Sequence, residues 1–111
     1  MLRVYGIKNC DTVKKTLKFL DQEKTDYDFI DFKKQVPTKE EILNWKKVFG
    51  DWPVNKRGRT FKSVAEDFEA ASDSEKIKII QEKTSTIRRP ITTDGKSFCF
   101  GHDEAFLKKL V

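Results

Sequence analysis

The sequence predicts an α/β protein in which a β-α-β segment, a helical insertion and a β-β-α segment build a mixed four-stranded sheet. Three observations predict this order. Residues 2–6 alternate between apolar and polar and end in Gly6, and an amphipathic helix pattern begins at Asp11. Residues 27–32 alternate again, as a second strand does. Asp94-Gly95 is a strong hairpin signal between two short apolar runs near the end of the chain.

The first helix carries its apolar residues on one face. Val13, Leu17 and Leu20 recur at spacings of four and three, and lysines occupy the positions between them. Residues 7–10 link this helix to the first strand. The crossover from residue 7 to residue 26 is long enough to bring the second strand parallel to the first.

A helical insertion is expected at about residues 34–86, between the second and third strands. Its first helix begins with Thr38, which forms a capping box with Glu41, and ends at Gly50. A basic, turn-rich stretch at 51–59 follows, and then helices over about 61–71 and 74–83. A second capping box pairs Ser72 with Glu75. The first helix is expected to bury Ile42, Trp45, Val48 and Phe49.

The C-terminal part returns to extended structure at residues 87–91, because a residue that precedes proline is pushed out of the helical region. Strands at 91–93 and 97–100 and a helix at about 103–110 complete the chain. Cys99 is expected in a central strand as a packed thiol. A β-α-β unit followed by a β-β-α unit is the thioredoxin-like (glutaredoxin-like) layout, here with extra helices in the middle.

The composition favours one soluble domain over residues 1–111. Hydrophobic and charged residues each make up 37% of the 111 residues. No window approaches the roughly 20 apolar residues of a membrane span, and the N-terminus lacks a secretory pattern, so we expect a cytoplasmic protein without membrane attachment. We also expect a monomer. The net charge of +5 is compatible with nucleic acid, an anionic substrate or plain solubility.

Cys10 is the residue most suited to chemistry. A thiol at the start of a helix faces unpaired backbone N–H groups and the positive end of the helix dipole, and both favour the thiolate. The positive charges of Lys8 and Lys14 also favour the thiolate, whereas the negative charge of Asp11 disfavours it. We therefore predict a nucleophile that attacks a disulfide, an oxyanion or a peroxide. The alternative is a small buried hydrophobic residue at the end of a strand.

Position 13 limits how this cysteine can work. Val13 stands three residues after Cys10, so the chain has no C-x-x-C pair and no local disulfide. Cys99, a second protein or a small thiol must resolve any covalent intermediate. Two cysteines do not make a disulfide framework, and no Cys/His group has the spacing of a zinc site, so neither a metal nor a bound cofactor is expected.

Arg88-Arg89-Pro90 is the second feature with chemical potential. Pro90 could be cis, as prolines in tight functional turns sometimes are. In a thioredoxin-like layout this turn lies against the cysteine loop. An arginine there could hold an oxyanion or the carboxylate of a thiol co-substrate and keep a thiolate charged. The alternative is a solvated basic pair before a strand.

Two weaker features complete the survey. The basic run from Lys56 to Arg59 surrounds a glycine, which suits phosphate, nucleic acid or an acidic protein, although such runs are more often solvated loops. His102 is the one histidine, and its position just before the last helix suits capping or exposure better than general-base catalysis. The charge is dispersed and no recognition motif is present, so specific nucleic-acid binding is not expected.

Residues 5–15 (YGIKNCDTVKK), with Arg88-Arg89-Pro90 further on, resemble the glutaredoxin-linked arsenate reductase (ArsC) family, and in particular its YffB-type, arsenate-reductase-like branch. The resemblance runs the whole chain. It implies a thioredoxin-like fold with a helical insertion and Cys10 as the nucleophile. It also implies Arg89 before the cis-proline and Arg57 facing the same pocket. The loop residues Lys8 and Asn9, which differ from the loop of the arsenate reductases, are expected to bind the anion as well.

The resemblance further implies an external reductant. In arsenate reductases the cysteine attacks arsenate, and glutathione with glutaredoxin resolves the product. This chain has Ser97-Phe98-Cys99-Phe100-Gly101 where those enzymes carry a further arginine. The function implied is therefore a glutathione-dependent thiol reductase acting on a small thiol or oxyanion, with glutathione as co-substrate and a glutaredoxin-like protein as partner.

The same superfamily contains the Spx regulators, which bind RNA polymerase and sense disulfide stress through a C-x-x-C switch. This sequence is similar to theirs in Arg-Arg-Pro and in general plan, but Val13 replaces the second cysteine. The alternative function is thus an Spx-like protein that binds RNA polymerase and catalyses no reaction.

Overall fold

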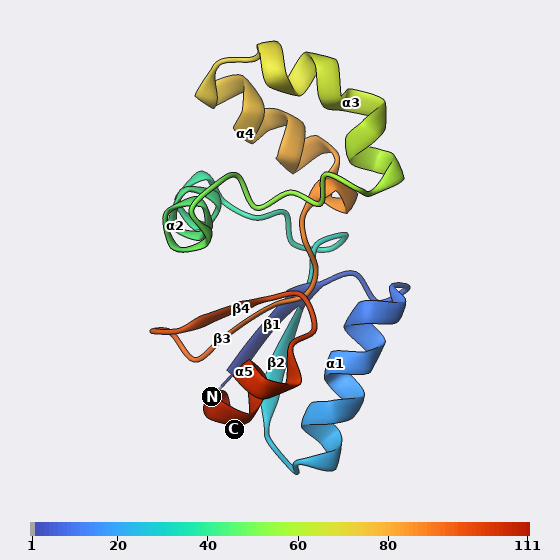
Figure 1. The fold of residues 1–111 in the computed structure, drawn as a ribbon, viewed down its shortest axis with the longest axis vertical. Helices are drawn as coiled ribbons and strands as arrows, with labels where there is room; N and C mark the ends of the chain where they lie inside the picture. The colour runs from blue at the N-terminus through green and yellow to red at the C-terminus, as the bar shows by residue number, and fades with distance from the viewer. Residues whose placement is uncertain (1) are drawn as a thin grey trace. The chain divides into compact units, whose positions relative to one another are not determined.

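The computed structural model describes residues 2–111. Two compact units divide the chain (Figure 1). Unit 1 contains the described residues up to Gln35 together with Arg89–Val111, and unit 2 contains Val36–Arg88. Unit 2 corresponds closely to the segment in which the sequence predicts a helical insertion.

Unit 1 has the predicted thioredoxin-like layout. Its strands are arranged in the order β2-β1-β3-β4, with β1 parallel to β2 and with β1–β3 and β3–β4 antiparallel. The fold class is confirmed. The elements are β1 (Leu2–Gly6), α1 (Asp11–Gln22), β2 (Tyr27–Asp31), β3 (Ile91–Thr93), β4 (Phe98–Phe100) and α5 (Glu104–Leu110).

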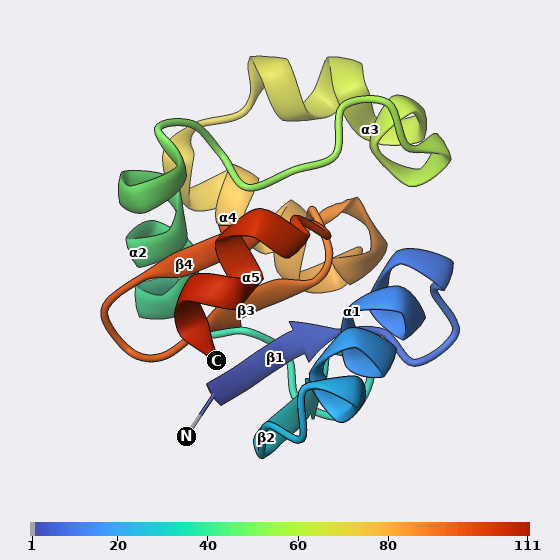
Figure 2. The same cartoon turned by 60° about the horizontal axis from the view of Figure 1, so that its bottom comes forward.

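Both helices of unit 1 contribute to one core. Val4, Thr92 and Cys99 are cross-strand partners, so their side chains point to the same face of the sheet. Side chains of α1 and α5 close over this face, and the strands and helices lie together in Figure 2. The buried members of the cluster are Leu2, Val4, Phe19, Leu20, Cys99 and Leu107.

The position predicted for Cys99 was wrong in one respect. Its strand, β4, is an edge strand of the sheet and not a central one. Cys99 is nevertheless only 3% exposed, because it belongs to the cluster that includes Leu107 of α5. A helix that covers one face can bury a residue even on an edge strand.

Unit 2 consists of α2 (Lys39–Phe49), α3 (Arg59–Ala70), α4 (Asp73–Glu82) and a short 3-10 turn, η1 (Thr84–Thr86). Both predicted capping boxes are present, at Thr38 with Glu41 and at Ser72 with Glu75. The helix expected from residue 61 begins two residues earlier, and the turn η1 was not predicted. The ring of Phe68 packs edge-on against Trp52 and Phe61.

The prediction of the buried face of α2 is correct for two of its four residues. Ile42 and Trp45 are buried, whereas Val48 is 48% exposed and Phe49 is 37% exposed. Val48 lies six residues after Ile42, a spacing that turns it away from that face. Phe49 precedes the helix end at Gly50, and its ring lies 5.9 Å from the Arg88 guanidinium.

Candidate active site

The candidate site lies where β1 ends. Tyr5 pairs with Ile91, and Gly6 pairs with Asp31. Because β1 and β3 are antiparallel, the loop that leaves β1 after Gly6 and the segment that enters β3 at Ile91 meet at the same end of the sheet. Cys10 is in the first of these segments and Arg89 is in the second, so the topology of unit 1 brings the two predicted site residues to one end of the sheet.

Cys10 is the N-cap residue of α1. Its backbone is extended (φ −133°, ψ 124°), and its carbonyl accepts the first helical hydrogen bond, from the N–H of Lys14 at 2.9 Å. The thiol makes no capping hydrogen bond, and the side chain is half-buried. A half-buried sulfur at this position lies next to the free N–H groups of the first turn and is accessible to a reagent.

Close packing between Gly6 and Val13 fixes the start of α1. A Cβ placed on Gly6 would lie 2.9 Å from Cγ2 of Val13, closer than two carbon atoms can approach without a shift. Val13 is fully buried. Position 13, which would carry the second cysteine of a C-x-x-C pair, is therefore filled by an apolar side chain that anchors the helix against β1.

The Arg89-Pro90 segment forms the other half of this end of the sheet. The peptide bond between the two residues is cis, and the Pro90 carbonyl accepts a hydrogen bond from the N–H of Gly101 at 2.8 Å. The Arg89 side chain is half-buried, and its Nε is buried with no hydrogen-bond partner among residues 2–111. A buried guanidinium N–H is a strong donor that an oxyanion or carboxylate would satisfy.

The remaining predicted residues have different environments. Lys8 and Asn9 are exposed in the loop before Cys10. Arg57 belongs to unit 2, where it lines a hollow of about 450 Å³ together with Lys56, Arg88 and Asp51. The carboxylate of Asp51 pairs with Lys56 at 3.2 Å. Neither Arg57 nor Arg88 has an ion-pair partner within the described chain, so this hollow is basic.

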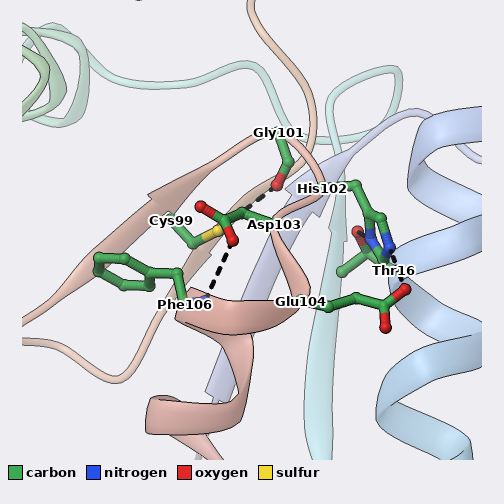
Figure 3. A network of polar contacts seen from close by, with 7 residues as sticks. All are labelled: Thr16, Cys99, Gly101, His102, Asp103, Glu104 and Phe106. Carbon is green, nitrogen blue, oxygen red and sulfur yellow. Dashed lines mark hydrogen bonds and ion pairs between the residues drawn. The ribbon is translucent and has the colours of Figure 1, made fainter.

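The second cysteine, Cys99, is not suited to act as a nucleophile. Burial raises the pKa of the Cys99 thiol, and the nearby carboxylate of Asp103 raises it further. The sulfur lies 3.5 Å from the carbonyl oxygen of Gly101, to which its S–H can donate (Figure 3). At neutral pH Cys99 is a protonated core thiol, which agrees with its predicted packing role.

A polar contact that sequence reasoning missed joins α1 to the turn after β4. Thr16 Oγ1 lies 2.8 Å from His102 Nδ1, and His102 Nε2 lies 3.2 Å from Glu104 Oε2 (Figure 3). The cap of α5 is Asp103 instead of His102. One signal was available in the sequence, because Thr16 is a polar residue at a core-facing position of α1, three residues after Val13 and four before Leu20.

Within residues 2–111, no group of three or more His, Cys, Asp or Glu side chains is placed to hold a metal ion. Across the same residues, no helix has the length and apolar character needed to cross a membrane.

The strand order and the cysteine at the head of α1 define a thioredoxin-like α/β protein. A solved glutaredoxin from Archaeoglobus fulgidus shares this fold, with a TM-score of 0.52 over 98% of this chain and 83% of that one, at 20% identity. The match to a protein family is more specific than this shared fold. Residues 5–110 match the model of the ArsC family, and the chain belongs to it.

Other members resemble the chain over nearly its whole length. A solved structure named YFFB protein is 31% identical, with a TM-score of 0.88 and full coverage of both chains. An uncharacterised protein of Haemophilus influenzae is 35% identical over 87% of this chain and 88% of its own. The regulatory protein MgsR of Bacillus subtilis is 28% identical over 98% of this chain and 89% of its own. The proteins similar to this chain therefore include one that is named as a regulatory protein.

Proposed function

We propose that this protein is an arsenate-reductase-like, glutathione-dependent thiol reductase of the cytoplasm, with Cys10 as its single nucleophile. The observation that carries the proposal is the half-buried Cys10 thiol at the N-cap of α1, at the sheet end that Arg89 also reaches. Membership of the ArsC family supports a redox reaction at this position.

With a disulfide substrate, the Cys10 thiolate attacks one sulfur, forms a mixed disulfide and releases the other sulfur as a thiolate. With an oxyanion, the thiolate attacks the central atom, and an oxygen leaves as water after protonation. In both cases Val13 offers no resolving thiol. With a disulfide substrate, an external glutathione or glutaredoxin-like thiolate attacks the outer sulfur of the mixed disulfide, forms a new disulfide with it and releases the Cys10 thiolate. With an oxyanion, a first external thiolate attacks the Cys10 sulfur and forms a mixed disulfide with it, while the central atom leaves with the electron pair and is reduced by two electrons. A second external thiolate then attacks the outer sulfur of that mixed disulfide and releases the Cys10 thiolate.

The basic side chains hold the anion in this scheme. Arg89 donates to the oxyanion or to a glutathione carboxylate through the guanidinium whose Nε is buried and unpaired among the described residues. Lys8 and Asn9 extend from the cysteine loop. The proposal therefore assigns anion binding to Arg89, Lys8 and Asn9, and chemistry to Cys10.

Steady-state turnover tests the proposal. The purified protein is supplied with reduced glutathione, with a glutaredoxin present or absent, and with arsenate or a small disulfide as oxidant. Wild type and Cys99→Ser should consume glutathione at similar rates, whereas Cys10→Ser should fall to the rate without enzyme. Turnover that persists in Cys10→Ser, or none with either oxidant, would refute the proposal.

MgsR supports a second candidate function, because a regulatory protein aligns with nearly the whole of this chain. In that case the protein acts by binding RNA polymerase. Capture of polymerase subunits that is equally strong for wild type and Cys10→Ser, together with no glutathione turnover, would favour the regulator over the reductase.

A further inference from the structure

We infer that the contact between Thr16 and His102 is a positioning clamp, which holds the helix that carries Cys10 in register with the segment that carries Arg89. The inference rests on the proposed function of Cys10 and identifies residues that act on it from outside the site. Thr16, His102 and Gly101 all lie in unit 1.

Thr16 ties α1 to the turn that follows β4. The residue is fully buried, and buried hydroxyl groups need a hydrogen-bond partner. That partner is Nδ1 of His102, at 2.8 Å. The other buried side chains of α1 are apolar. Apolar packing tolerates small shifts of a helix, whereas this hydrogen bond fixes the rotation of α1 and its position along the helix axis at one point.

The imidazole of His102 is itself fixed. An ionised Glu104 carboxylate can only accept, so the Nε2 of a neutral ring carries the proton and donates to Glu104 Oε2 at 3.2 Å. The Nδ1 atom is then the acceptor, and the hydroxyl of Thr16 donates to it. The ring also packs edge-on against Phe19, with 6.4 Å between centroids.

The same turn holds the Arg89 segment. Gly101, the residue before His102, donates its backbone N–H to the carbonyl of Pro90 at 2.8 Å. Gly101 adopts φ +86°, a left-handed conformation that favours glycine. Two adjacent residues therefore bind two different segments. His102 contacts Thr16 of α1, as Figure 3 shows, and Gly101 binds Pro90, the residue next to Arg89. Loss of the Thr16 hydrogen bond would release Cys10 from its fixed relation to Arg89.

The test is the ratio of two alkylation rates at Cys10, one for iodoacetate and one for iodoacetamide, each located by peptide mass spectrometry. The anionic reagent gains from a guanidinium held near the sulfur and the neutral reagent does not. Thr16→Val removes the hydroxyl at nearly constant shape and should lower this ratio about two- to tenfold, the range expected for one net hydrogen bond. Thr16→Ser keeps the hydroxyl and should retain the wild-type ratio.

His102→Leu should lower the ratio of the two alkylation rates as Thr16→Val does. The double variant should lower this ratio no further than either single variant. Cys99 reports loosening of the fold, because it is buried and its S–H points at Gly101 O. An unchanged ratio in Thr16→Val, or a fall matched by faster labelling of Cys99, would overturn the clamp. A slow wild-type Cys10, no faster than in the urea-unfolded chain, would instead count against the proposed function.

Discussion

The two cysteines occupy opposite environments in one small unit. Cys10 heads a helix, is half-buried and makes no capping bond. Cys99 is buried on β4 beside the carboxylate of Asp103, and burial is the larger cause of its raised pKa. Position in the fold therefore decides which thiol is accessible to a reagent, and the predicted packing of Cys99 agrees with its burial.

The raised pKa of Cys99 predicts a loss of stability at alkaline pH. In the unfolded chain a cysteine ionises at about 8.5, before the buried thiol does. The contribution of Cys99 is therefore fully present below that pH and is lost as the pH rises toward the higher folded-state pKa. Urea unfolding at pH 7 and at pH 10 should show a smaller drop in the free energy of unfolding for Cys99→Ala than for wild type. Equal drops would contradict this assignment.

At the scale of the elements, local signals predicted more than non-local ones. The capping boxes at Thr38 and Ser72 depend on residues three positions apart, and both are confirmed. The edge position of β4 depends on which strands pair across most of the chain, and the prediction of a central strand failed. The prediction that Val48 is buried also failed, although its spacing of six residues from Ile42 turns it away from the buried face.

Ser72 and Ser74 offer a matched test of helix capping in α4. Ser72 accepts from the backbone N–H of Glu75 and completes the capping box, whereas Ser74 is an exposed residue of the first turn. Ser72→Ala should lower the free energy of unfolding by about 1 kcal/mol, and Ser74→Ala should change it by less than about 0.5 kcal/mol. Both tryptophans lie in unit 2, so denaturant unfolding followed by their fluorescence reports this unit. Equal losses in the two variants would rule out the cap as the cause.

At the scale of the whole molecule, the sequence predicted the thioredoxin-like layout and the segment of the insertion. It predicted Cys10 at the helix start because strand, loop and helix are adjacent in the chain. It did not predict the contact between Thr16 and His102, which are 86 positions apart and meet only once the sheet has formed. The match to the family model then shows that the chain belongs to the ArsC family.

We propose that Cys10 alone forms the covalent intermediate and that an outside thiol resolves it. Incubation with oxidised glutathione, followed by intact-protein and peptide mass spectrometry, tests this directly. Wild type and Cys99→Ser should each gain one glutathione, located on Cys10 and removed by reduced glutathione, and Cys10→Ser should gain none. An adduct on Cys99 in place of Cys10, or an unmodified Cys10 in the wild type, would contradict the claim.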